Sequence, residues 1–271
     1  MRNLTTTICL AVALLLGTSG VSWSQDFQKG VAAAQNGDYA TALREWTPLA
    51  KQGDADVQFR LGVMYDQGKG IPQDYKTAVK WYRLAARQGD SSAQHALGSM
   101  YIKGRGVPQD DKTAVKWFRL AAEQGNANAQ FLIGLMHEAG QGIPQDYKSA
   151  LKFYRLAARQ GNSSAQHSLG QLYQSGKGIP QDYKTAVKWF RLAAEQGQPF
   201  AQYALGRMYI FGEGVIQDLV MAHMWGNIAA SNGSENGGKL RDIATKNMTP
   251  ADLSTAQNLA RECVRKNYKG C

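Results

Sequence analysis

The stretch Gly68-Lys-Gly-Ile-Pro-Gln-Asp74 sets the pattern of this 271-residue chain. Further copies of it, with small changes, lie at residues 104–110, 140–146, 176–182 and 212–218. Successive copies start 36 residues apart, and the last keeps this spacing although Ile216 stands where the others have proline. A constant period of this size indicates a solenoid, in which similar units stack and bury one continuous core.

Each copy lies between two stretches that have the periodicity of a helix, as residues 90–124 illustrate. Asp90 can cap a first helix that ends before Gly104, a residue type that often terminates helices. The proline of the motif stops this helix from continuing, and Asp110 or Asp111 can cap a second one. Apolar residues of the second helix recur at i, i+3, i+4 and i+7, so one of its faces should pack against the first. The sequence therefore predicts an all-α fold of antiparallel helix pairs.

A glycine occupies the middle of every first helix: Gly62, Gly98, Gly134, Gly170 and Gly206. Inside a helix a glycine is about 1 kcal/mol less favourable than alanine. We therefore expect the two helices of each pair to cross closely at this point. The alanines expected to face the glycines and leave room are Ala78, Ala114, Ala150, Ala186 and Ala222.

The repeated unit closely resembles the Sel-one-like repeat, a relative of the tetratricopeptide repeat. The resemblance rests on Ala-x-Ala-Gln-x-x-Leu-Gly-x-Met-Tyr before the turn and on Ala-x-x-Trp-Tyr-x-x-Ala-Ala-x-x-Gly after it, and it covers residues 54–233. Residues 25–53 look like a more tetratricopeptide-like opening pair. The resemblance implies a right-handed α-solenoid that binds proteins or peptides. Some members with a cysteine pair in every repeat have been linked to β-lactam binding or hydrolysis, but this chain lacks those cysteines, which leaves such an enzyme a distant third possibility.

The first residues read as a secretory signal. Arg2 precedes an apolar run at residues 8–16, and small residues such as Ser24 precede a plausible cleavage site before Gln25. The run is shorter than the roughly 20 residues that span a bilayer, although an uncleaved anchor is the alternative. We expect residues 1–24 to be removed and the mature chain to be periplasmic or secreted, without stable membrane insertion.

The C-terminal part, residues 234–271, departs from the repeat and is expected to cap the solenoid. We predict a loop at 234–238, a short helix at 239–247 and a last amphipathic helix at 251–267. Cys263 and Cys271 should close a small loop by a disulfide in an oxidising compartment, with two free thiols as the alternative.

The first helices carry the candidate partner-binding groove. In the tetratricopeptide arrangement that the unit resembles, the first helix of each pair lines a concave groove. One column of positions has a ring in every repeat: Phe59, His95, Phe131, His167 and Tyr203. Beside it lie Ser99, Gln171 and Arg207. Aromatic and arginine side chains are common anchors in peptide recognition, and the alternative is that the rings only complete the packing between adjacent repeats.

The second helices carry rows of basic residues at spacings that place them on one helical face. Four lysines at the same repeat position form what we call the basic ridge: Lys80, Lys116, Lys152 and Lys188. The net charge of +10 favours anionic partners. Because the chain is predicted to be exported, an anionic polymer of the cell envelope is a better candidate than nucleic acid. The alternative is a solvated outer face copied along with the repeat.

No pattern of catalytic residues stands out. One structural role, helix capping, explains the aspartates at the starts of the second helices: Asp74, Asp110, Asp146, Asp182 and Asp218. The four histidines, His95, His137, His167 and His223, have no spacing typical of metal ligands. The glycine-rich turns end in proline and lack a phosphate-binding lysine. We therefore expect a non-enzymatic protein without a metal or cofactor.

Overall fold

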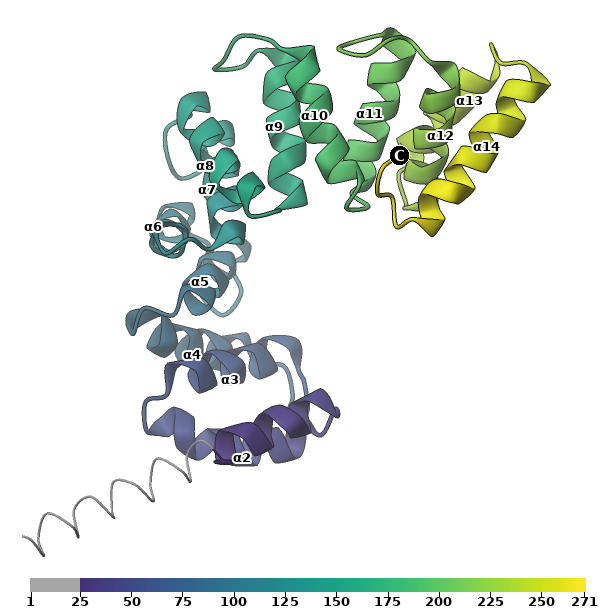
Figure 1. Cartoon of the computed structure of the whole chain (residues 1–271). Helices are drawn as coiled ribbons and strands as arrows, with labels where there is room; N and C mark the ends of the chain where they lie inside the picture. The colour runs from purple at the N-terminus through teal and green to yellow at the C-terminus, as the bar shows by residue number, and fades with distance from the viewer. Residues whose placement is uncertain (1–24) are drawn as a thin grey trace, which may run out of the picture. The chain divides into compact units, whose positions relative to one another are not determined.

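The computed structural model describes residues 25–271, and within that range the regular elements are all helices (Figure 1). The predicted signal peptide lies outside the described residues. The chain divides into two compact units, the first ending at Gln124 and the second comprising Gly125–Cys271. No helix within residues 25–271 has the length and hydrophobicity needed to cross a membrane.

The helices follow the predicted pairing. After a helix at residues 25–35, the first unit contains α2 (Tyr39–Lys51), α3 (Ala55–Gln67), α4 (Tyr75–Arg87), α5 (Ser91–Lys103) and α6 (Asp111–Glu123). The second unit contains α7 (Ala127–Ala139), α8 (Tyr147–Arg159), α9 (Ser163–Ser175), α10 (Tyr183–Ala194), α11 (Pro199–Phe211), α12 (Leu219–Ser231), α13 (Glu235–Thr245) and α14 (Pro250–Arg265). The two helices of each repeat pack on one another, and within each unit the first helix of the next repeat packs on the second helix of the one before. The predicted solenoid of helix pairs is confirmed.

The repeated turn works as a helix stop followed by a helix start. Gly104 ends α5 in the left-handed conformation, with φ of 63°. Asp110, rather than Asp111, caps α6, and its carboxylate accepts a hydrogen bond from the Thr113 backbone N–H at 3.0 Å. The glutamine of the motif also has a role, since Gln145 Nε2 donates to the carbonyl oxygen of Glu138 near the end of α7, at 2.8 Å. The turn is therefore rigidly bonded to both helices.

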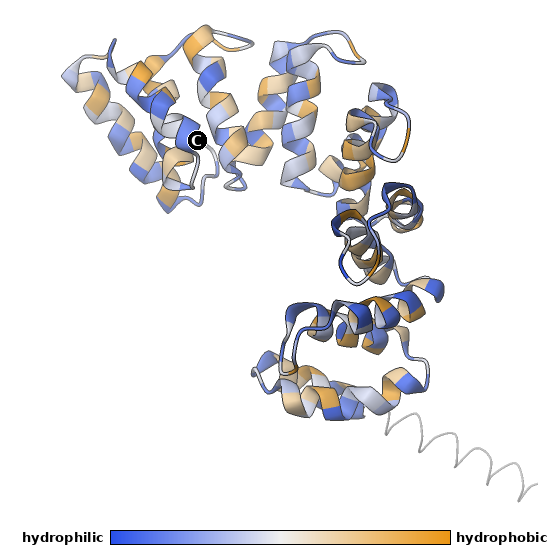
Figure 2. Cartoon of the chain, turned by 180° about the vertical axis from the view of Figure 1, so that it is seen from behind, coloured by the Kyte–Doolittle hydropathy of each residue, from blue (hydrophilic) through white to orange (hydrophobic). Residues whose placement is uncertain are grey.

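The mid-helix glycines mark close crossings, as predicted, but at four of them an aromatic ring rather than an alanine is the nearest neighbour. At Gly206 the nearest atom is Cδ2 of Leu240, in α13. A Cβ atom added at Gly98 would lie 2.7 Å from Cε1 of Phe118, and one at Gly170 would lie 2.5 Å from Cδ1 of Phe190. Both rings are fully buried. The first four glycines therefore make room for a large buried ring of their own repeat. Figure 2 shows hydrophobic and hydrophilic residues interleaved along the helices.

A row of buried glutamines links neighbouring repeats, which the sequence did not predict. Gln94 donates from Nε2 to the carbonyl oxygen of Ala86, at 3.2 Å, and its Oε1 accepts from Gln124 at 2.8 Å. The same arrangement occurs at Gln166, which is only 5% exposed. The last carbonyl groups of a helix lack hydrogen-bond partners within it. The glutamine side chains donate to such a carbonyl at the end of a second helix and so join that helix to the next pair.

The prediction of a loop at residues 234–238 is wrong, because α13 begins there. Ser234 caps this helix, and its hydroxyl accepts a hydrogen bond from the backbone N–H of Gly237. A Cβ atom at Gly237 would lie 2.7 Å from that of Ala229, so this glycine lets α13 approach α12 closely. Two glycines of the stretch predicted as a loop are thus inside a helix, and at least one serves helix packing.

The chain ends in a helix fixed at both ends. Thr249 and Asp252 form reciprocal capping hydrogen bonds at the start of α14. At its other end a disulfide joins Cys263 to Cys271. The hydroxyl of Tyr268 donates to Oδ1 of Asn232 at 3.1 Å, which ties the tail to the end of α12. Both α13 and α14 pack on α12.

Candidate functional site

The rings of the predicted groove are half-buried, and four of the five pack against a ring from the second helix of their own repeat. The centroid distances are 5.9 Å for Phe59 and Tyr82, 5.7 Å for His95 and Phe118, 5.9 Å for Phe131 and Tyr154, and 5.6 Å for His167 and Phe190. This is packing within a repeat, whereas the sequence had suggested packing between repeats as the alternative. All five rings remain partly exposed.

A pocket of about 160 Å³ opens between α9 and α11 in the second unit. Four of the predicted groove residues line it: His167, Gln171, Tyr203 and Arg207. Gln174, from a neighbouring column of the same first helices, also lines it, and so do Phe200 and Asn236, which were not predicted. The ring of Phe200 is 62% exposed and lies 6.3 Å from that of His167. The structure thus brings half of the predicted groove residues together at one place.

A sequence signal for Phe200 did exist. The same repeat position has Asp56, Ser92, Asn128 and Ser164 in the other repeats. A large aromatic residue that replaces small polar ones at an exposed position has no role in the core, and this marks the position as a candidate contact site.

The pocket combines neutral aromatic walls with one cation. Burial lowers the pKa of His167 to about 4, so its imidazole is uncharged at neutral pH. The guanidinium of Arg207 lies 5.8 Å from the centre of the Phe211 ring and has no carboxylate within 4.0 Å among the described residues. Gln174 donates a hydrogen bond to Glu213 at 3.2 Å, which fixes its side chain at the pocket. The arrangement suits an apolar or aromatic side chain beside an acidic group.

The remaining candidate residues do not line this pocket. Phe59, His95 and Ser99 belong to the first unit, and Phe131 lies on α7. The Ser99 hydroxyl donates to the carbonyl oxygen of His95 within α5, at 3.1 Å. Burial, with a smaller effect of the Lys103 charge, lowers the pKa of His95.

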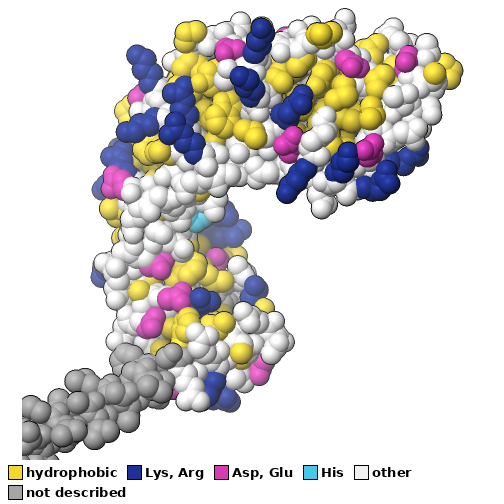
Figure 3. Space-filling model, viewed as in Figure 1, with side chains coloured by type: hydrophobic (Ala, Val, Ile, Leu, Met, Phe, Trp, Pro, Cys, Tyr) yellow, Lys and Arg dark blue, Asp and Glu magenta, His cyan; other side chains and the backbone are white. Residues whose placement is uncertain are grey.

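The basic rows contain two kinds of residue. Arginines of the rows bond to the next pair: Arg155 donates to the Tyr173 hydroxyl at 2.6 Å and Arg191 to that of Tyr209 at 2.8 Å. The lysines of the basic ridge are exposed and have no carboxylate within 4.0 Å among residues 25–271. Figure 3 shows Lys and Arg side chains among hydrophobic ones on the visible face of the second unit.

The last repeat shows what happens when another helix covers this face. Met224 and Ile228 of α12 stand where α10 has Lys188 and Leu192. They are 2% and 1% exposed and belong to the same hydrophobic cluster as Ala260 of α14. A covered second helix is therefore apolar at these positions, whereas Leu192 remains 44% exposed beside its lysine. The lysine-bearing faces suit solvent or a polyanion better than an apolar partner.

Stacked helix pairs joined by rigid turns and buried glutamines define an α-solenoid scaffold. Five consecutive segments match the Sel1 repeat model, at residues 55–90, 91–126, 127–162, 163–198 and 199–234. The chain belongs to the Sel1 repeat family.

A solved structure agrees with this assignment. A Sel1 repeat protein from Oxalobacter formigenes is 30% identical, with a TM-score of 0.78 over 85% of this chain and 96% of that one. A protective antigen with an SLR fold from uropathogenic Escherichia coli is 26% identical over 91% of this chain and 70% of its own, with a TM-score of 0.42. No curated protein matches the chain.

Proposed function

We propose that the protein is an exported, non-catalytic scaffold that binds a protein or peptide partner through its first helices. Repeat scaffolds of this family typically serve protein–protein interaction. The observation that carries the proposal is the pocket between α9 and α11, where four predicted groove residues meet the exposed Phe200.

The size and chemistry of the pocket favour a side chain of a larger partner. Its volume of about 160 Å³ is below the roughly 300–1,000 Å³ of small-molecule sites. Aromatic and arginine side chains dominate the binding energy of protein interfaces. An apolar side chain of the partner would enter between Phe200 and Tyr203, and a neighbouring carboxylate would pair with Arg207.

Site-specific crosslinking tests this proposal. A photoreactive phenylalanine analogue placed at Phe200, in the protein expressed in its native cells, should give one discrete adduct. The adduct should disappear when Tyr203 and Arg207 are changed to alanine, and it should persist when Lys188 is changed to glutamate. An adduct that survives the double substitution, or the absence of any adduct under conditions where the protein is folded and abundant, would refute the proposal.

A second candidate function is binding of an anionic envelope polymer through the basic ridge. It is favoured by the exposed lysines that have no acidic partner among the described residues. Changing Lys80, Lys116, Lys152 and Lys188 to glutamate should abolish such binding and leave the Phe200 adduct intact. Binding should also fall steeply with salt, because exposed charges are screened over about 10 Å at 0.1 M. If binding were unaffected by both the lysine substitutions and added salt, the basic ridge would be excluded as the binding surface.

Export is part of the first proposal. The signal-like pattern of residues 1–24 supports it, as does the disulfide between Cys263 and Cys271, a bond that forms in oxidising compartments. Cell fractionation followed by N-terminal sequencing should find a mature chain that starts at Gln25 outside the cytoplasm. A cytoplasmic protein that retains Arg2 would contradict this.

A further inference from the structure

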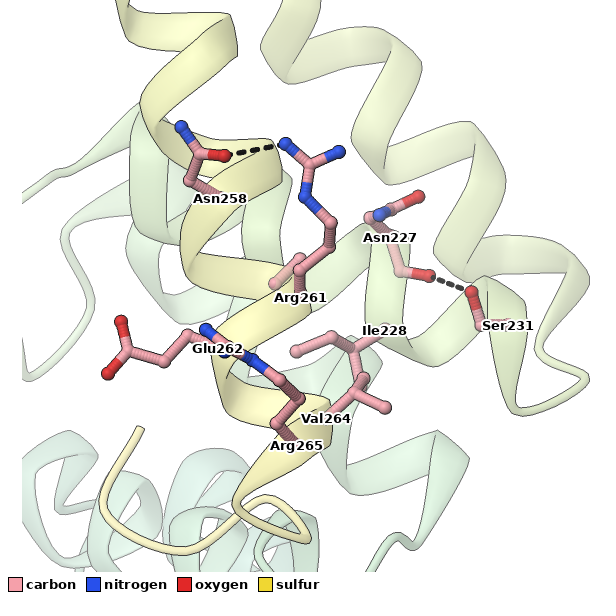
Figure 4. Close-up of a pocket in the computed structure, with 9 residues that line it drawn as sticks. Asn227, Ile228, Ser231, Asn258, Arg261, Glu262, Val264 and Arg265 are labelled. Carbon is pink, nitrogen blue, oxygen red and sulfur yellow. Dashed lines mark hydrogen bonds between the residues drawn. The ribbon is translucent and has the colours of Figure 1, made fainter.

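A larger cleft lies at the C-terminal end of the second unit, between α12 and α14. Its main part has a volume of about 700 Å³ (Figure 4). A second part of about 450 Å³ extends between α12, α13 and α14. Asn227 and Arg261 line both parts, so the two adjoin at these side chains. The cleft is separate from the pocket between α9 and α11, with which it shares no residue.

The main part of the cleft has an apolar floor. Ile228 of α12 and Val264 of α14 lie next to each other between the two helices in Figure 4. Ile228 is almost fully buried, whereas Val264 is 46% exposed although it belongs to a helix that packs on the core. An apolar side chain laid over Val264 would remove that surface from water, which is favourable.

The charges around the floor are mainly positive. Three guanidinium groups line the cleft: Arg241, Arg261 and Arg265. The acidic side chain in the lining is that of Glu262, and it is 2.6 Å from the ammonium group of Lys266. Asp242 pairs with Arg241 at 2.8 Å, so Arg261 and Arg265 are the guanidiniums without a carboxylate within 4.0 Å among the described residues. The cleft therefore favours an anionic ligand.

The polar part of the cleft has hydrogen-bonding groups that the protein does not use. Asn227 stands at the repeat position where Arg155 and Arg191 bond to a tyrosine, but its side-chain amide bonds to no other residue of the described chain. His223 is 3% exposed, lines the cleft and has no hydrogen-bond partner for Nδ1 among residues 25–271. Buried polar groups of this kind are normally satisfied.

The shape and chemistry together indicate an extended peptide. The lining of the cleft follows α14 from Leu253 to Arg265, a length of about 18 Å at 1.5 Å per residue. An extended segment of five or six residues covers about the same length. We propose that this cleft binds an acidic peptide segment of a partner protein, with an apolar side chain over Val264 and carboxylates paired with Arg261 and Arg265. Amide groups such as that of Asn227 would bond to the peptide backbone.

Synthetic peptides can test this proposal with the mature chain. The probes are fluorescent hexapeptides that contain one leucine, valine or phenylalanine flanked by glutamates, and matched hexapeptides in which lysines replace the glutamates. Fluorescence polarisation should show binding of the acidic series at least tenfold tighter than that of the lysine series. Serine in place of the apolar residue should weaken binding by a similar factor.

Variants of the protein place the binding at this cleft. Arg261→Gln with Arg265→Gln, and separately Val264→Ser, should each reduce affinity at least tenfold. All three side chains are exposed, so the variants should keep the circular dichroism spectrum of the parent. Arg207→Gln in the other pocket and Lys188→Gln on the basic ridge are the controls and should have no effect. Equal binding of the acidic and lysine series would overturn the proposal. So would loss of binding in Arg207→Gln while the Arg261 and Arg265 variant still binds. Neither outcome depends on the crosslinking result at Phe200.

Discussion

Replacing Gly237 and Gly238 separately with alanine tests the close approach of α13 to α12. Both glycines are inside α13, where alanine is favoured over glycine by about 1 kcal/mol. A methyl group at Gly238 would have the Cβ of Ala230 as its nearest neighbour, at 3.9 Å. Nothing opposes the gain there, so Gly238→Ala should stabilise the protein by about 1 kcal/mol.

The neighbouring position should respond in the opposite direction. A methyl group at Gly237 would lie 2.7 Å from Cβ of Ala229 and from the backbone nitrogen of Ala230, and 2.9 Å from the carbonyl oxygen of Gly226. Backbone atoms cannot move aside without separating the two helices. Overpacking of this kind costs roughly 1–3 kcal/mol, which offsets or exceeds the propensity gain of about 1 kcal/mol, so we expect a net loss of up to about 2 kcal/mol.

Urea unfolding followed by circular dichroism measures both effects on the same scale. The midpoint should rise for Gly238→Ala and fall for Gly237→Ala at an unchanged slope, and the slope converts each shift into a free energy. If residues 234–238 were a flexible loop, the two substitutions would have similar effects. Similar shifts in the two variants, of either sign, would therefore refute the packing described for α13.

Two further predictions concern the repeats. Gln166→Leu removes the donor to the Ala158 carbonyl and the acceptor for Gln196. It should lower the free energy of unfolding by about 1–3 kcal/mol in the same urea experiment. A decrease below about 0.5 kcal/mol would contradict this. His167→Phe, which copies Phe131, should reduce the acid sensitivity of the fold. Burial holds the folded-state pKa of His167 at about 4, below its ordinary value of 6.5, so the unfolded chain binds a proton that the folded chain does not, and stability falls as pH drops through this interval. The melting temperature should fall less between pH 7 and pH 5 in the variant, and equal falls in both proteins would contradict the reasoning.

The helices and turns were predictable because their signals are local. The first helix of the second repeat was expected from residue 91 to 103 and is found as Ser91–Lys103. Its capping aspartate, its terminal glycine and the proline after it act within a few residues of one another. The same rules failed at Gly237 and Gly238, because consecutive glycines suggest a loop when the helix that they pack against is not known.

The candidate site was only partly predictable. The column of rings and Arg207 were predictable because the repeat spacing shows which positions share a face of the first helix. Phe200 and Asn236 come from other parts of the register, and only the packing of α11 and α13 beside α9 brings them to the same pocket.

The amino-acid sequence alone determined the repeat, the helix boundaries and the Sel-one-like unit, because periodicity, capping and turn chemistry depend on residues near one another in the chain. The tertiary structure decided how those surfaces are used. It packs aromatic rings against four of the five mid-helix glycines, joins repeats through buried glutamines and places α14 against α12, where the cleft forms. These features depend on distances between side chains far apart in sequence, and no local pattern of residues specifies such distances.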